Sequence, residues 1–391
     1  MKTTDKISRF IVGLVFIFSG FVKAIDPLGS TYKFVDYFDA FGMEFLSFLA
    51  LPLAIILSTL EFAIGFSLLM GTRKKLTAWL LILFMSFFTI LTFILAIYNP
   101  VSDCGCFGDA FIMTNWQTFW KNLFLMVFTL VIFINKDKYL STWSLKKQWS
   151  LLSLPIIFSI LISVHCYNNL PIIDFRPYKV GTYIPEKMVS PPDAAKAVYE
   201  TMLVYQKNGE EKEFSIENLP DSTWEWVSTE NILISEGYVP PIHDFTIETM
   251  FGNDITEIVL NDDKCTFIMV AYNLNKSNLK NISEINELAD FALESGNCNF
   301  ICLTSSLESE INEFKQKTNA TYSFFNTDEI TLKTIVRSNP GIVLLKNGTV
   351  VAKWHHRKIP TKEELSKDFI ENPLYQKTAT DKEEVLALSE N

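Results

Sequence analysis

The sequence predicts an α-helical membrane bundle followed by an α/β domain. The chain has 391 residues, and 49% of them are hydrophobic, which is more than one soluble domain needs. The apolar excess lies in long stretches before Cys166, and the chain after Cys166 is polar and acidic. From Ile242 onward, apolar runs of strand length alternate with helical patterns. The net charge of −10 and the lack of a basic face exclude a nucleic-acid partner.

Five stretches are suited to cross a lipid bilayer, which requires roughly 20 mainly apolar residues. They are Phe10–Ile25, Leu49–Met70, Leu76–Tyr98, Phe119–Ile134 and Leu151–Cys166. We therefore expect a four-helix membrane domain over residues 1–148 and a fifth transmembrane helix over 149–166. A linker with a small β region should follow over 167–240, and an α/β domain over 241–391.

Basic residues between these stretches predict the orientation of the chain, because lysine and arginine flank spans on the cytoplasmic side. If all five spans are real, the basic clusters fall on one side: Lys2, Lys6 and Arg9; Arg73, Lys74 and Lys75; Lys136, Lys138, Lys146 and Lys147. We expect a bacterial inner-membrane protein with a cytoplasmic N-terminus. The acidic loop Asp26–Phe48, the loop with Cys104 and Cys106, and everything after Cys166 should then be periplasmic.

The run Asp103–Gly108 contains two cysteines, Cys104 and Cys106, separated by one glycine. A disulfide across this spacing closes a very small ring, and strained disulfides are more oxidising. On the oxidising side of the membrane, the pair suits thiol–disulfide exchange. Two alternatives remain: the cysteines brace the loop, or they bind copper or zinc together with His355 and His356.

Glu61 lies in the middle of the second span, where an ionisable group is costly and functional by default. It is a candidate proton acceptor for a thiol or for a quinone-like carrier. The alternative is a protonated Glu61 bonded to a serine or threonine of a neighbouring helix, such as Ser86 or Thr89. Lys23, near the end of the first span, is expected to anchor the helix at the interface or to pair with Asp26.

The segments Gly13–Pro27 and Cys104–Gly108 resemble the DoxX/MauE membrane family. Ser338–Gly341 and Lys353–His355 resemble the appended domain of the long form of this family in Bacteroidetes-type bacteria. The resemblance implies a four-helix core similar in style to quinone-linked disulfide-forming membrane enzymes. MauE-type proteins are associated with maturation of methylamine dehydrogenase, and DoxD relatives with thiosulfate:quinone oxidoreduction. By this resemblance Cys104 and Cys106 are the exchange pair and a quinone is the implied cofactor, although no quinone motif is transferable.

The second half of the chain predicts two small units. Met202–Glu217, with Asn208-Gly209 at its centre, reads as a hairpin. Beyond it, the expected order is strand, helix, strand, helix, hairpin and helix. These elements are Cys265–Tyr272, Ser277–Leu293, Cys298–Thr304, Leu307–Lys317, Gly341–Trp354 and a helix from Thr361. This order resembles the thioredoxin fold, which places a cis proline where Pro340 stands.

The predicted thioredoxin-like domain lacks the cysteine pair that this fold carries after its first core strand. That place reads Tyr272–Ser277 here, and serine or asparagine cannot act as the attacking thiolate. We expect Asn273, Asn339 and Pro340 to form a binding site for an extended segment of a partner protein. The alternative is a scaffold without a binding function.

The remaining cysteines have ordinary explanations. Cys265 and Cys298 begin neighbouring predicted strands and could form a structural disulfide; the alternative is that Cys298 or Cys302 is a buried free thiol. Cys166 either packs at the membrane interface or resolves the Cys104–Cys106 pair. No metal ion is expected.

Two classes of function follow from these observations. In the first, the protein is a membrane thiol–disulfide oxidoreductase that uses Cys104, Cys106 and Glu61 on a periplasmic protein client. In the second, it is a non-enzymatic assembly factor or a subunit of a membrane complex, and its thioredoxin-like domain binds a partner.

Overall fold

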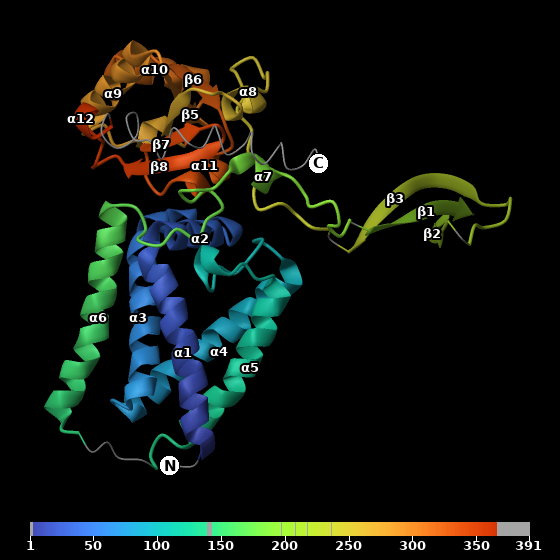
Figure 1. The fold of residues 1–391 in the computed structure, drawn as a ribbon. Helices are drawn as coiled ribbons and strands as arrows, with labels where there is room; N and C mark the ends of the chain where they lie inside the picture. Colours follow the sequence, from blue (N-terminus) through green and yellow to red (C-terminus); the bar gives the residue numbers. More distant parts are fainter. Residues whose placement is uncertain are drawn as a thin grey trace, which may run out of the picture.

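The computed structural model describes residues 3–138, 143–196, 198–207, 209–216, 218–235 and 237–365. Lys2, Asn208, Glu217 and the chain after Leu365 lie outside these ranges, and with them part of the first basic cluster, part of the predicted hairpin and most of the last predicted helix. Figure 1 shows a helical bundle, an α/β domain above one end of it, and a small sheet that extends to the side.

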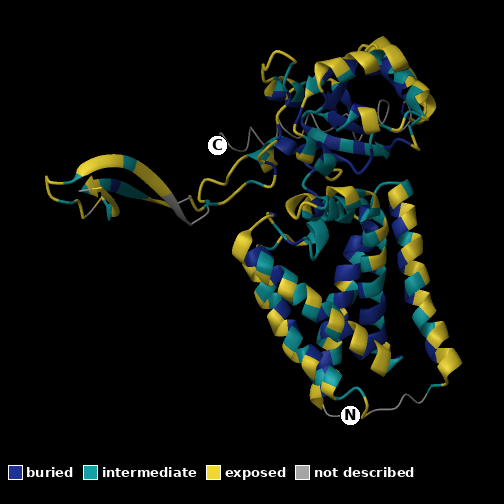
Figure 2. Cartoon of the chain, turned by 180° about the vertical axis from the view of Figure 1, so that it is seen from behind, coloured by how far each residue is buried: buried dark blue, intermediate teal, exposed yellow. Residues whose placement is uncertain are grey.

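The bundle contains five helices that are long and apolar enough to cross a membrane, as the sequence predicts. Its long helices are α1 (Thr3–Ile25), α3 (Ala50–Met70), α4 (Lys74–Tyr98), α5 (Asn115–Ile134) and α6 (Leu145–Asn168). Large apolar side chains are exposed along the outer faces of α4, α5 and α6, among them Phe87, Phe124 and Leu161 (Figure 2). A lipid bilayer would cover these faces.

Helices α1 and α3 pack backbone against backbone because glycines face one another. A methyl group on Gly20 would lie 2.5 Å from the Phe62 nitrogen, and one on Gly65 would lie 2.6 Å from the Ile17 nitrogen. Small residues at such contacts are typical of membrane helices. This close approach lets short polar side chains on α1 reach α3.

Two elements between α1 and α3 were not predicted. Helix α2 (Pro27–Ala40) begins at Asp26, whose carboxylate accepts a hydrogen bond from the Gly29 nitrogen at 2.9 Å. The 3-10 helix η1 (Glu44–Leu49) then leads into α3. Asp-Pro is a helix-start signal, with aspartate as the cap and proline in the first turn. The region expected as a loop therefore forms a helix that covers one end of the bundle.

The basic clusters and the cysteine loop lie at opposite ends of the bundle. The start of α1, the α3–α4 connection and the α5–α6 connection are at one end, and the loop between α4 and α5 is at the other, below the α/β domain (Figure 1). The basic clusters and the cysteines therefore lie at opposite ends of the bundle, as expected for helices that cross a membrane in alternating directions.

The α/β domain is built on a five-stranded sheet in the order β6-β5-β4-β7-β8. The strands are β4 (Cys265–Val270), β5 (Cys298–Thr304), β6 (Ser323–Asn326), β7 (Gly341–Lys346) and β8 (Thr349–His355). Strands β4, β5 and β6 are parallel, whereas β7 and β8 are antiparallel to their neighbours. This mixed sheet, with helices on both faces, is thioredoxin-like, as predicted.

Alternate residues of the strands supply the two halves of the core. Phe267, Met269 and Ile342 pack against the side of α9 (Ile282–Ser295) and α10 (Glu308–Thr318). Ile268 and Val343 pack on the opposite face, where α8 (Thr256–Leu260) and α11 (Glu329–Ile335) contribute. The short α12 (Lys362–Leu365) adds Leu365 to the first half. Both β6 and α11 are short, and neither was predicted.

Residues between the bundle and the α/β domain form a separate antiparallel sheet in the order β2-β1-β3. Its strands are β1 (Val198–Lys207), β2 (Glu210–Ser215) and β3 (Glu225–Ser235). The predicted hairpin corresponds to β1 and β2, and β3 is an additional strand. Both views show this sheet extending sideways from the body (Figures 1 and 2). The helix α7 (Ile184–Met188) precedes it and lies beside β8 through the Tyr183–Thr349 bridge.

Candidate functional site

Cys104 and Cys106 face each other in the loop between α4 and α5. Their sulfur atoms are 3.0 Å apart and not bonded, which is a thiol–thiolate contact. Gly105 and Gly108 have φ values of +64° and +50°, a region that favours glycine, and they turn the loop before the 3-10 helix η2 (Gly108–Ala110). Cys104 is buried and Cys106 is half-buried.

Side chains from α1 and α2 hold this loop in place. The Tyr37 hydroxyl donates to the Cys104 carbonyl at 2.8 Å. The Lys33 ammonium binds the Asp103 carboxylate at 2.7 Å. The Ser19 hydroxyl lies 2.7 Å from the Cys106 carbonyl. The unpredicted helix α2 therefore supplies two of the three contacts that fix the redox-capable loop.

The two sulfurs differ in acidity. The pKa of Cys106 is lowered to about 6, first by the hydrogen bond that the Cys104 thiol donates and then by the ammonium groups of Lys121 and Lys23. The pKa of Cys104 is raised well above its usual value, because its proton is held by Cys106 and because it is buried. At neutral pH the pair thus contains one thiolate and one thiol, which is the state needed for nucleophilic attack on a disulfide.

Glu61 forms a buried ion pair with Lys23. The Lys23 ammonium lies 2.7 and 2.8 Å from the two Glu61 oxygens, and the two side chains are 8% and 6% exposed. The expected interface anchor at Lys23 is therefore wrong, as is its pairing with Asp26. Glu61 also does not bond Thr89, whose hydroxyl donates to the Met85 carbonyl. The sequence did contain a signal for this ion pair, because an acidic residue and a basic residue each lie in an apolar span.

The cysteines and the ion pair line the same cavity, which has a volume of about 230 Å³. Its walls are mainly aromatic and aliphatic, and its polar groups include Ser19, Lys23, Glu61, Cys104 and Cys106. The aromatic side chains are Phe16, Phe34, Tyr37, Phe38, Phe41, Phe84, Phe87, Phe88 and Phe107.

These residues fit a flat, apolar redox carrier such as a quinone. Aromatic walls suit the faces of a planar ring, and Ser19, Lys23 and Glu61 are polar groups that could bind the carbonyl oxygens of such a ring. Cys106 lines the same cavity. The structure thus brings together all three predicted catalytic residues, Cys104, Cys106 and Glu61.

The predicted binding residues meet in the α/β domain. The Asn339–Pro340 peptide bond is cis, as expected. The Asn339 amide donates to the Asn273 carbonyl at 2.8 Å, and the Asn278 nitrogen donates to the Asn339 carbonyl at 2.9 Å. The segment that replaces a cysteine pair is therefore tied to the proline loop by hydrogen bonds.

Arg337 connects this proline loop to the membrane bundle. Its guanidinium lies 2.9 Å from a carboxylate oxygen of Asp26 and 2.6 Å from one of Asp109, just beyond Cys106. Burial alone would lower the pKa of Arg337, but the two carboxylates raise it. Beside this contact, the rings of Tyr32 and Tyr272 meet edge to face with centroids 6.2 Å apart. The proline end of the α/β domain is therefore docked beside the cysteine loop, which the sequence did not indicate.

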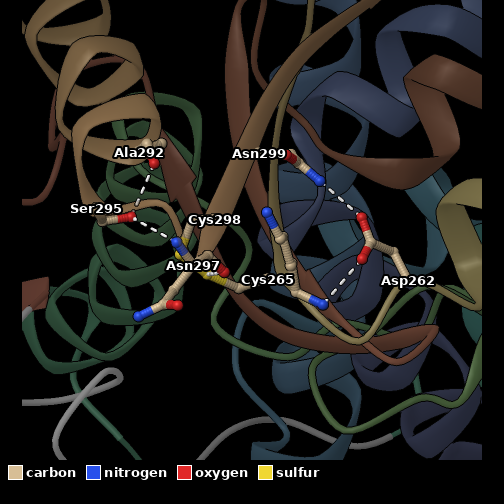
Figure 3. The surroundings of a disulfide bond; sticks show 8 residues. Asp262, Cys265, Ala292, Ser295, Asn297, Cys298 and Asn299 are labelled. Atoms are coloured by element: carbon tan, nitrogen blue, oxygen red, sulfur yellow. Dashed lines mark hydrogen bonds between the residues drawn. A yellow bond between two sulfur atoms is a disulfide. The ribbon is translucent and has the colours of Figure 1, made fainter.

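The other cysteines lie away from this site. Cys265 and Cys298 are paired across β4 and β5 and form a disulfide (Figure 3), one of the two fates expected for them. They stand at the beginning of these strands, whereas Tyr272 follows the end of β4. Strand β4, which lies between the two positions, has six residues and spans about 17 Å. Cys166 and Cys302 are buried thiols.

The metal alternative finds no support among the described residues, where no group of three or more His, Cys, Asp or Glu side chains is placed to hold an ion. His355 and His356 stack on one another in the α/β domain, and the His356 Nδ1 atom lies 3.0 Å from the Ser338 hydroxyl. Burial lowers the pKa of each to about 4, so both are neutral at pH 7.

Residues 1–135 match the family described as methylamine utilisation protein MauE, and residues 199–236 match a family described as a domain of unknown function. No curated protein matches the chain. A solved putative protein disulfide isomerase from Bacteroides thetaiotaomicron is similar at 16% identity. The matched region covers 35% of this chain and 84% of the chain of the solved protein, with a TM-score of 0.26. A secreted Mycobacterium tuberculosis disulfide oxidoreductase, homologous to E. coli DsbE, is similar at 15% identity over 35% of this chain and 96% of its own, with a TM-score of 0.24.

Proposed function

Starting from the MauE match of the bundle and the thioredoxin-like fold of the appended domain, we propose that this protein is a membrane thiol–disulfide oxidoreductase. Cys104 and Cys106 are its exchange pair, and cysteines of a periplasmic protein client are its substrate. The observation that carries the proposal is the placement of a thiolate–thiol pair and a buried carboxylate on one apolar cavity.

The oxidation of a client follows ordinary exchange chemistry. A client thiolate attacks the Cys104–Cys106 disulfide, and a mixed disulfide forms as one of the two sulfurs leaves as a thiolate. Cys106 suits the leaving role, because a sulfur with a low pKa leaves faster. The second client thiol then attacks the mixed disulfide and gives its proton to Cys104, which leaves Cys106 as thiolate and Cys104 as thiol. Two electrons have passed from the client to Cys104 and Cys106.

Re-oxidation of the pair needs a two-electron acceptor at the cavity. A bound quinone supplies this chemistry, because closing the Cys104–Cys106 disulfide delivers two electrons and the resulting quinol takes up two protons. The Glu61 carboxylate, with Lys23, is the ionisable pair on the cavity wall available to hold a proton there. The aromatic walls orient the ring and exclude water.

The orientation follows from the charge distribution. The basic ends of the spans lie opposite the cysteine loop, so the positive-inside tendency supports a cytoplasmic N-terminus. We propose that the protein resides in a bacterial inner membrane with its α/β domain in the periplasm, where the compartment is oxidising.

The thiol state of the pair tests this function. Cells are quenched with acid and labelled with a maleimide that adds mass, with and without a quinone pool. Wild-type protein should carry oxidised Cys104 and Cys106 when quinone is present and reduced thiols when it is absent. The double variant Cys104→Ser and Cys106→Ser should lose client oxidation, while Cys166→Ala should retain it. A thiol state that is indifferent to quinone would exclude the redox function.

A second candidate is a non-enzymatic assembly factor or complex subunit. Its support is the α/β domain, in which residues 272–277 contain no cysteine and the half-buried Asn273 and Asn339 are hydrogen-bonded beside the buried Pro340. In that case, the Cys104/Cys106 double variant should still recover the partner in a cross-linking experiment. Pro340→Ala should reduce recovery, with the exposed Lys317→Met as the control.

A further inference from the structure

Ser19 lies at the point where the buried ion pair meets the cysteine loop. Its hydroxyl oxygen is 2.8 Å from a Glu61 carboxylate oxygen, 2.7 Å from the Cys106 carbonyl oxygen and 2.9 Å from the Lys23 nitrogen. Both other oxygens can only accept, and a hydroxyl has one proton. At any moment, the Ser19 hydroxyl can therefore donate its hydrogen bond to Glu61 or to the Cys106 carbonyl, but not to both.

Lys23 does not share this freedom. An ammonium group has three N–H donors, and here three acceptors surround it: the two Glu61 oxygens and the Ser19 oxygen. Its side chain is 8% exposed. Lys23 is thus a fixed positive charge, and Ser19 must donate elsewhere because it accepts from Lys23. The proton of Ser19 is the movable part of the network.

We propose that Ser19 is a positioning residue that couples the charge of Glu61 to the backbone of the Cys104–Cys106 loop. The inference rests on the proposed thiol function and assigns Ser19 a role in it. An ionised Glu61 attracts the Ser19 proton, because hydrogen bonds to a charged acceptor are the stronger ones. Removal of the Glu61 charge, as in Glu61→Gln, takes away this advantage, and Ser19 then donates to the Cys106 carbonyl.

Close packing allows this coupling. Ser19 is one residue before Gly20, where α1 touches the backbone of α3, so a short hydroxyl reaches Glu61 directly. Other charged groups act on Cys106 as well: Lys23 from α1, Glu61 from α3, Lys121 from α5 and the Cys104 thiol in its own loop. Lys33 of α2 also binds Asp103, the residue that precedes Cys104 in the loop. A test must separate Ser19 from these through-space effects.

A double-mutant cycle makes that separation. The full-length reduced protein in detergent is alkylated with iodoacetamide over a series of pH values, and the Cys106 peptide is quantified by mass spectrometry. Glu61→Gln should shift the pH midpoint of Cys106 alkylation downward by about one unit when Ser19 is present and by less than about half a unit in Ser19→Ala, since residues in one hydrogen-bond network are not additive. Ser19→Thr, which retains the hydroxyl, should restore the full effect.

Ser58→Ala is the matched control, because Ser58 is a buried serine on α3 that donates to the Ile55 carbonyl outside this network. It should leave the Glu61→Gln effect unchanged. An equal Glu61→Gln effect with and without Ser19, in variants that retain the wild-type elution profile, would overturn the proposal. The assay contains neither client nor quinone, so its failure is distinct from a failure of the quinone-dependent thiol trapping.

Discussion

Cys104 and Cys106 are two residues apart, yet their surroundings give them opposite acidities. Cys106 receives the proton of its neighbour and the field of two ammonium groups, while Cys104 is held through its backbone by Tyr37. The division of roles follows from these contacts. Cys106 is the better leaving group, and Cys104 is the sulfur whose proton must be removed before the ring closes.

The rate of Cys106 alkylation should rise with pH through a midpoint of about 6, because the thiolate is the reactive form and the pKa of Cys106 is lowered to that value. Cys104→Ala should move the midpoint upward, because it removes the thiol that donates a hydrogen bond to Cys106. Mass spectrometry of the alkylated peptides measures both. Cys302, a buried thiol of raised pKa, should stay unlabelled in the same samples. A midpoint near 9 in the wild type would contradict the thiolate assignment.

The candidate site was predictable from sequence where one residue type carries the chemistry by itself. A Cys-Gly-Cys loop and a glutamate within an apolar span are visible in any reading of the chain. Ser19 and Arg337 were not, because a serine in a helix and an arginine near a strand are ordinary. Ser19 reaches Glu61 only because α1 packs against α3, and Arg337 reaches Asp26 only because the α/β domain docks on the bundle.

At the scale of elements, the α1–α3 contact depends on glycine. Gly20→Ala would place a methyl group 2.5 Å from the Phe62 nitrogen, so the helices must separate. We expect a loss of about 2 kcal/mol in unfolding free energy, typical of overpacking. Because Ser19 would lose its reach to Glu61, Cys106 alkylation should change too. Thermal unfolding in detergent measures the first effect, and Ser153→Ala on the exposed face of α6 is the control. Wild-type stability of Gly20→Ala would refute the close contact.

The disulfide between β4 and β5 is a second element-level feature. Cys265 and Cys298 are separated by 33 residues, and a cross-link of this span stabilises a domain by about 3 kcal/mol. Replacing both with serine should lower the melting temperature of the α/β domain. The quinone response of Cys104 and Cys106 should persist, because the disulfide is at the far end of the strands. A lost response in a variant that stays folded would mean that this disulfide takes part in electron transfer.

Elements were predicted where their hydrophobic period was long. The five spans and the strands β4, β5, β7 and β8 follow from apolar runs. By contrast, β6 has four residues and α11 has seven, which is too short for a period to register. Helix α2 was missed although Asp26-Pro27 signals a helix start, because its acidic residues were read as a loop. Strand β3 was missed because it pairs with β1 and not with β2, the strand that precedes it in the sequence.

For the whole molecule, Arg337 is the main polar link between the two halves. Arg337→Met should leave Asp26 and Asp109 without a counter-charge. The cost should be about 2 kcal/mol, below the range for fully buried pairs, because the Asp109 side chain is 36% exposed. The docked α/β domain should open more often, and a water-soluble maleimide should label Cys106 faster than in the wild type. Lys317→Met, on the exposed surface of α10, should not change the rate. Unchanged labelling of Arg337→Met would show that the domain does not control access to the pair.

The sideways sheet sets the reach of this molecule. Strand β3 has 11 residues, and at about 3.3 Å per residue its contour is roughly 36 Å. Both of its connections to the chain leave from the same side, so the far hairpin tip is a free end (Figure 1). The far end of the sheet therefore stands clear of the bundle and of the α/β domain, where a neighbouring protein can contact it.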